Sequence, residues 1–65
     1  MTAAELKALR DSTGLTQIAF VVQVLDCELT TTALSRYENG RSPIPAFTAD
    51  AIRVRVQRFL DALEG

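Results

Sequence analysis

Signals that start and end helices recur along the whole chain and constrain its fold more than any other feature. Thr2 followed three residues later by Glu5 has the spacing of a capping box, in which each side chain bonds a backbone N–H at a helix start. Gly14 followed by Leu15 is typical of a left-handed helix end with its hydrophobic contact. We therefore predict a first helix that begins at Thr2 and ends near Thr13.

A second helix is predicted after Thr16, whose side chain can cap it. The residues of its apolar face are Ile18, Phe20, Val21, Val24 and Leu25. The segment IAFVVQVL is rich in β-branched residues, which favour strands, so a strand is the competing prediction. A lone strand would have no pairing partner, because no second alternating run follows a hairpin turn. We therefore predict a helix, although no glycine or proline in residues 25–29 marks its end.

A third helix of about two turns is predicted before Asn39–Gly40, because these residues tolerate the positive φ of a helix end. Thr30 or Thr31 can cap its start. Leu34 and Tyr37 are three residues apart and therefore lie on the same side of the helix. We predict that this side faces the core.

The fourth helix is expected over residues 46–63, with Pro45 in its first turn. A step of about 100° per residue places one apolar stripe at Ala49, Ile52, Val56, Phe59, Leu60 and Leu63. A second, narrower patch contains Phe47, Ala51, Val54 and Ala62. Either the helix lies deep in a small bundle, or one patch packs on the core and the other on a second copy, which we favour. The residues predicted for that interface are Ile52, Val56, Phe59, Leu60 and Leu63.

Length and composition limit the class of protein. A chain of 65 residues with 48% hydrophobic residues predicts one all-α domain, a four- to five-helix bundle with a long C-terminal helix. No apolar run approaches the ~18 residues of a membrane span. The start MTAAELKALR also lacks the pattern of a signal peptide. We therefore expect a cytoplasmic protein with no membrane partner.

The chain has no histidine and a single cysteine, Cys27. A small buried hydrophobic residue is its expected role, and a reactive thiol is the alternative. Without histidine or a Cys/His cluster, the commonest general base and the commonest metal ligands are missing. We therefore expect no catalytic residues, metal, cofactor or small-molecule ligand, and the protein is not expected to be an enzyme.

Positive charge is concentrated in the second half of the chain. The formal net charge is −1, but residues 29–58 carry five arginines against Glu38 and Asp50. DNA binding depends on where positive charge lies as well as on the total, because each phosphate contact releases counterions locally. The acidic balance therefore does not exclude a DNA-binding protein.

Three segments carry a resemblance to a known family: LKALR from Leu6, GLTQ from Gly14 and LSRYENG from Leu34. In this order and rough spacing they resemble the phage repressor and Cro-type helix-turn-helix family over about residues 3–47. The resemblance implies a helix-turn-helix at about residues 16–40, with the second helix across the DNA backbone and the third in the major groove. The chain has about three more residues between these motifs than the family usually has, so either the second helix is longer or the turn is wider.

The face of the third helix opposite Leu34 supplies the candidates for reading bases: Thr31, Thr32, Ser35 and Arg36. The planar guanidinium of Arg36 can donate two hydrogen bonds to a guanine, and a solvated surface arginine is the alternative. Threonine can offer a hydroxyl to a base edge or a methyl group to thymine, whereas capping is the other role of a threonine at a helix start.

The resemblance also implies roles outside this face. Gln17, Asn39 and Arg41 match positions that contact DNA phosphates and read no sequence, with a solvated loop charge as the alternative for Arg41. Arg10 and Glu38 match a partly buried ion pair with a structural role.

Together these features predict a small Cro-like transcription regulator of a bacteriophage or prokaryote. It would act as a homodimer through the fourth helix and bind a short operator in double-stranded DNA. The alternative is a protein-interaction module, such as an antitoxin or anti-repressor, that uses the apolar surface of the same helix to bind another protein.

Overall fold

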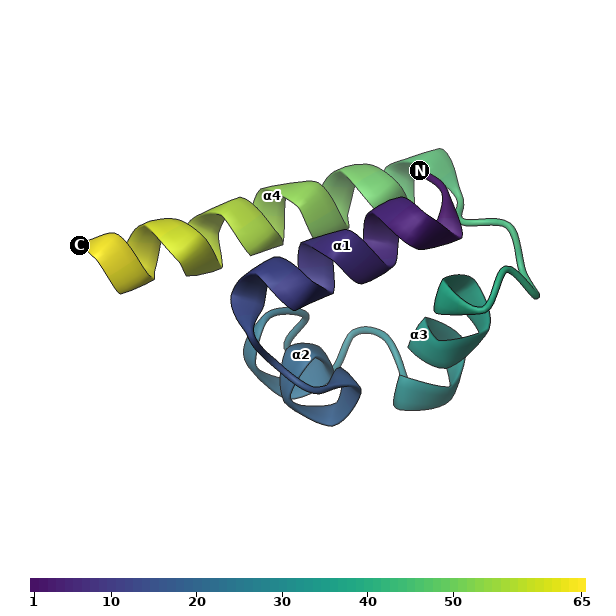
Figure 1. Ribbon diagram of the computed structural model, residues 1–65, viewed down its shortest axis with the longest axis horizontal. Coiled ribbons are helices and arrows are strands. Elements are labelled where there is room, and N and C mark those ends of the chain that lie inside the picture. Colours follow the sequence, from purple (N-terminus) through teal and green to yellow (C-terminus); the bar gives the residue numbers. More distant parts are fainter.

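The computed structural model describes all 65 residues, which form four helices and no strand (Figure 1). The helices are α1 (Ala3–Thr13), α2 (Gln17–Gln23), α3 (Thr31–Glu38) and α4 (Ala46–Glu64). The all-α prediction is therefore confirmed. The β-branched segment is helical only as far as Gln23, so Val24 and Leu25, predicted for the apolar face of the second helix, lie just after α2. The longest helix, α4, lies beside α1, and its C-terminal end extends beyond the other helices (Figure 1).

Side-chain caps begin the first three helices at the expected residues. Thr2 and Glu5 form both hydrogen bonds of the capping box, and the bond from the Thr2 backbone N–H lowers the pKa of the Glu5 carboxyl. Thr16 and Thr30 each accept a hydrogen bond from the backbone N–H three residues later, at 3.2 and 3.0 Å. Of the two threonines that could cap α3, Thr30 is therefore the one that does.

Replacing Thr30 with alanine should destabilise the protein by about 1 kcal/mol, because the backbone N–H of Ala33 loses its side-chain acceptor. Urea or thermal unfolding, followed by circular dichroism, measures the loss. Thr31→Ala is the matched control, since Thr31 is the first residue of α3 and not its cap. Equal losses in the two variants would contradict the capping role.

Glycines end α1 and α3 as predicted. Gly14 and Gly40 have φ values of 72° and 70°, a conformation that strains any residue with a Cβ. Asn39 keeps a negative φ of −90°, so Gly40 alone takes the left-handed conformation after α3. The start of α4 differs slightly from the prediction, because Pro45 precedes the helix instead of lying in its first turn.

The core is a cluster of residues from all four helices and from the segment after α2. Its eight members are Leu6, Phe20, Val21, Val24, Leu25, Leu34, Ile52 and Val56. Helix α1 contacts each of the other three helices, and α2 contacts α3. Leu34 is fully buried and Tyr37 packs against the cluster, as predicted for the inner side of α3. The core therefore determines which side of α3 faces solvent.

The predicted interface on α4 is wrong for Ile52 and Val56. Both side chains are 2% exposed within the core of the chain itself, so a second chain cannot reach them. Phe59 and Leu60 pack against the same core and are partly buried, and only Leu63 is largely exposed. In so short a chain, the widest apolar stripe is used to complete its own core, because burial of this stripe removes the most apolar area from water.

The narrower apolar patch of α4 is the one that faces solvent. Phe47 is 79% exposed and Val54 is 50% exposed, and Ala51 and Ala62 are also exposed. The structure thus supports a helix with one apolar side packed on the core and another left free, instead of a helix buried on all sides. None of the four helices has both the length and the apolar composition needed to cross a membrane.

The connection between α2 and α3 covers residues 24–30. Helix α2 ends at Gln23, and the segment 24–30 is anchored by the buried side chains of Val24 and Leu25. Asp26 and Cys27 both have positive φ, at 51° and 61°. Cys27 is exposed, so its predicted burial is wrong. The physical reason is a turn closed by a 3.0 Å hydrogen bond from the Glu28 backbone N–H to the Leu25 carbonyl, which has Asp26 and Cys27 at its centre and leaves Cys27 in solvent.

Candidate nucleic-acid interface

The outer side of α3, opposite Leu34, carries four polar side chains. Thr32 and Arg36 are exposed, whereas Thr31 and Ser35 are half-buried. All four were the candidates for reading bases. They share this side because the fully buried Leu34 fixes the rotation of α3 about its own axis.

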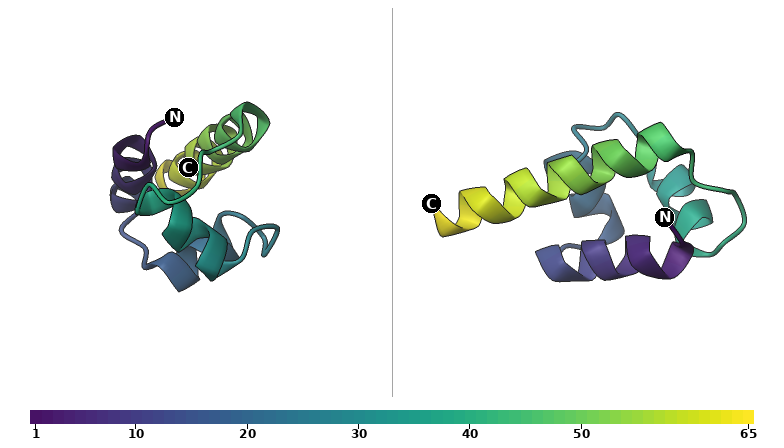
Figure 2. Two further views of the ribbon diagram at one scale, coloured as in Figure 1. Left: turned by 90° about the vertical axis from the view of Figure 1, so that its right-hand side faces the viewer. Right: turned by 90° about the horizontal axis from the view of Figure 1, so that it is seen from above.

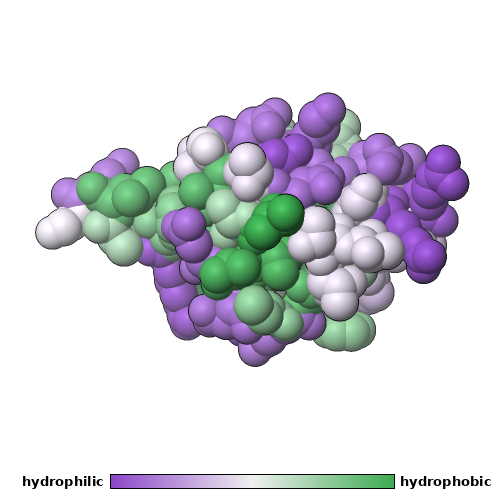
Figure 3. All heavy atoms as spheres, turned by 90° about the horizontal axis from the view of Figure 1, so that it is seen from below, coloured by the Kyte–Doolittle hydropathy of each residue, from purple (hydrophilic) through white to green (hydrophobic).

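The structure brings all seven predicted DNA-contacting residues around one open surface hollow. The residues that line it are Gln17, Thr31, Thr32, Ser35, Arg36, Asn39 and Arg41, and none of them is hydrophobic. Gln17 begins α2, four of the residues lie on α3, and the last two follow α3. Seen from below, the end of the molecule that contains α3 is intermediate to hydrophilic in hydropathy, and the most hydrophobic surface lies at the middle and toward the C-terminal end of α4 (Figure 3).

The two arginines of this hollow have no acidic partner in the chain. The five ion pairs of the protein involve Arg10, Arg53 and Arg55, and neither Arg36 nor Arg41 takes part in any of them. No carboxylate lines the hollow. Although the net charge of the protein is −1, this surface therefore presents two uncompensated positive charges.

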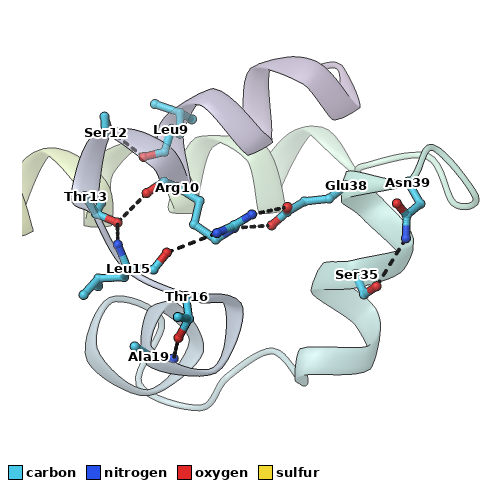
Figure 4. Close-up of polar contacts among 10 residues, drawn as sticks. All are labelled: Leu9, Arg10, Ser12, Thr13, Leu15, Thr16, Ala19, Ser35, Glu38 and Asn39. Carbon is cyan, nitrogen blue, oxygen red and sulfur yellow. Dashed lines mark hydrogen bonds and ion pairs between the residues drawn. The ribbon is translucent and has the colours of Figure 1, made fainter.

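Asn39 is held in place by the helix that precedes it. Its side-chain Nδ2 donates a hydrogen bond to the Ser35 hydroxyl oxygen at 3.3 Å (Figure 4). The Ser35 hydroxyl hydrogen and the second amide hydrogen of Asn39 stay free to donate. Both residues can thus bind an acceptor, such as a phosphate oxygen or a base edge, without breaking the bond between them.

The predicted ion pair between Arg10 and Glu38 is present and links α1 to α3. Arg10 donates from Nε and Nη2 to the two carboxylate oxygens of Glu38, at 2.8 and 2.9 Å (Figure 4). The side chains of Arg10 and Glu38 are 15% and 4% exposed. The hydrogen bonds to Glu38 raise the pKa of Arg10 above its usual value. Arg10 thus neutralises Glu38, the one acidic residue of α3, and Arg36 is the only charge on the outer side of that helix.

The same arginine also fixes the segment that leads into α2. Its Nη1 donates to the backbone carbonyl of Leu15 at 3.1 Å, between the end of α1 and the start of α2 (Figure 4). One guanidinium therefore contacts α3 through Glu38 and the α1–α2 connection through Leu15. These contacts hold Gln17 and the outer side of α3 in one arrangement.

A second arginine, Arg55 of α4, has a structural role that the sequence did not reveal. It donates to Glu28 Oε2 at 2.6 Å and to Asp26 Oδ2 at 3.3 Å. These carboxylates lie on either side of Cys27 in the connection between α2 and α3, where Asp26 and Cys27 have positive φ. No spacing rule predicts such contacts, because the paired residues are 27 and 29 positions apart in sequence.

Comparisons with family models, with curated proteins and with solved structures found no match to this chain. Within the protein, no three histidine, cysteine, aspartate or glutamate side chains lie close enough to hold a metal ion together.

Proposed function

We propose that this protein is a sequence-specific DNA-binding transcription regulator. In this proposal α2 and α3 act as a helix-turn-helix, with α3 in the major groove of a short operator and a homodimer as the binding species. The observation that carries the proposal is the hollow in which Gln17, four α3 side chains, Asn39 and Arg41 meet. Its two free arginines and its lack of carboxylates suit a polyanion.

The side chains of the hollow divide into two roles. Arg36 is exposed on the outer side of α3, where two parallel N–H donors of its guanidinium can bind O6 and N7 of a guanine. Arg41 follows the helix in an exposed loop, where it can bind a phosphate and orient the protein. Gln17 and Asn39 add uncharged donors on either side of α3. The Arg10–Glu38 pair supports both roles by fixing α3 against α1.

Selection of binding sites from random duplex DNA tests the proposal. We expect a palindromic site whose half-sites are about one helical turn, ~34 Å, apart. The affinity for the selected duplex should fall steeply with salt, because bound arginines release counterions from the phosphates. Recovery of no preferred sequence, together with an affinity that does not change with salt, would overturn the proposal.

A protein-interaction module is the second candidate function, and the exposed apolar patch of α4 favours it. Phe47 is 79% exposed and lines a groove together with Leu25, Leu29 and Ala51. A helix of another protein could bind in this groove and cover its apolar residues. Such a module, an antitoxin or anti-repressor, would give neither a preferred DNA site nor a salt-dependent affinity. The selection experiment therefore separates the two functions.

A further inference from the structure

The free side of α4 has the sequence pattern of a helix that pairs with another helix. Phe47, Ala51, Val54 and Arg58, the α4 stripe, follow one another at alternating spacings of four, three and four residues. On a helix these positions form a single line, which lies almost opposite the core residues Ile52 and Val56. All four members of the stripe are exposed, and Phe47 is the most exposed large hydrophobic residue of the protein.

A groove runs beside this stripe, between α4 and the connection 24–30. Leu25, Leu29, Phe47 and Ala51 form its hydrophobic part. None of the residues that line it belongs to the hollow at α3. The connection and α1 lie on opposite sides of α4 when the protein is seen from above (Figure 2). A partner on this flank would therefore leave the candidate DNA interface uncovered.

The charges of the stripe indicate which partner fits. Arg58 takes part in no ion pair of the chain. Asp50 lies one turn from Phe47 at the edge of the stripe, is 78% exposed, and has only a 3.6 Å contact with the half-exposed Arg53. An arginine covered by a partner needs a carboxylate opposite it. The chain supplies that carboxylate itself if a second copy of α4 lies antiparallel to the first.

We propose that the α4 stripe is the interface with a second copy of this chain, paired antiparallel about a two-fold axis between Ala51 and Val54. In this register Ala51 packs on the partner's Val54, and Arg58 lies against the partner's Phe47 and Asp50. A parallel pair would instead place Arg58 of one chain against the partner's Arg58, so that two positive charges would face each other. The inference rests on the proposed function, in which the regulator binds as a homodimer, and it specifies the face and the direction of pairing.

Sedimentation equilibrium of the full chain without DNA tests this interface. The parent chain should be dimeric, and Val54→Asp should weaken the dimer by about tenfold or more, because it places two carboxylates in the apolar centre of the interface. Val22→Asp is the matched control, since Val22 of α2 is 53% exposed and Val54 is 50% exposed. Circular dichroism should show both variants folded. A monomeric parent chain, or a loss caused by Val22→Asp and not by Val54→Asp, would overturn the proposal.

A charge exchange tests the antiparallel direction. Arg58→Asp and Asp50→Arg should each weaken the dimer, and the double variant should recover most of the parent affinity, because the opposite charges face each other again. No recovery in the double variant would overturn the antiparallel pairing. A chain that selects a DNA site as a monomer would refute the interface and the homodimer, but not sequence-specific DNA binding. A dimer through α4 that selects no site would refute only the DNA-binding function.

Discussion

The Glu38→Ala variant should unfold at a much lower temperature than the parent chain, with a loss of about 3–5 kcal/mol in the free energy of unfolding. The substitution removes the carboxylate that accepts two hydrogen bonds from Arg10, whose side chain is only 15% exposed. Each 1 kcal/mol shifts Tm by roughly 4–8 °C in a domain of this size, so we expect a decrease of at least about 12 °C. Differential scanning calorimetry measures the shift.

Arg36→Ala is the matched control for this prediction, because it also introduces alanine into α3 but at an exposed side chain without an ion pair. Its stability should stay within about 0.5 kcal/mol of the parent value. The free energy of unfolding of Glu38→Gln should lie between those of the two alanine variants, since its amide oxygen still accepts a hydrogen bond from Arg10. If Arg36→Ala lowered Tm more than Glu38→Ala, the buried pair would not be a main support of α3.

On the selected operator, Arg36→Ala should remove the preference for one base in each half-site. The variant should bind the duplex with the preferred base about 1–3 kcal/mol more weakly than the parent chain does. The guanidinium of Arg36 is exposed on the outer side of α3 and has no acidic partner to compete with the DNA. Titration of a panel of duplexes, each with one base pair changed, measures the preference position by position.

Arg41→Ala provides the comparison, because Arg41 lines the same hollow but lies in the loop after α3. It should weaken binding to every duplex in the panel evenly and reduce the salt slope by about one for each lost phosphate contact. The Tm of both variants should match that of the parent chain. If Arg36→Ala also weakened every duplex evenly, the two arginines would not have separate roles.

The helix boundaries could be predicted from sequence because the interactions that set them are local. The caps at Thr2, Thr16 and Thr30 bond backbone groups three residues away, and Gly14 and Gly40 act through their own backbone freedom. Such signals need no knowledge of the rest of the chain. The end of α2 carried no such signal, and only the structure shows that α2 stops at Gln23 and that the connection to α3 turns at Asp26 and Cys27.

Much of the candidate site could also be predicted from the sequence, because helical periodicity is a local property. Once Leu34 faces the core, the helical period places Thr32 and Arg36 on the opposite side of α3. The partner of Glu38, in contrast, is 28 residues away, and it was predicted from the resemblance and not from any local pattern. The contacts of Arg55 with Asp26 and Glu28 were indicated neither by a local pattern nor by the resemblance, and the sequence did not predict them.

The sequence by itself thus determined the helical class of the fold, most helix boundaries and the side of α3 that faces solvent, since capping and periodicity act within a turn or two of helix. The tertiary structure alone decided the use of the two apolar surfaces of α4. Both surfaces satisfy the same helical period, but only the stripe with Ile52 and Val56 fits against Leu6, Phe20 and Leu34. Phe47 and Val54 stay outside this core and are exposed on the single chain.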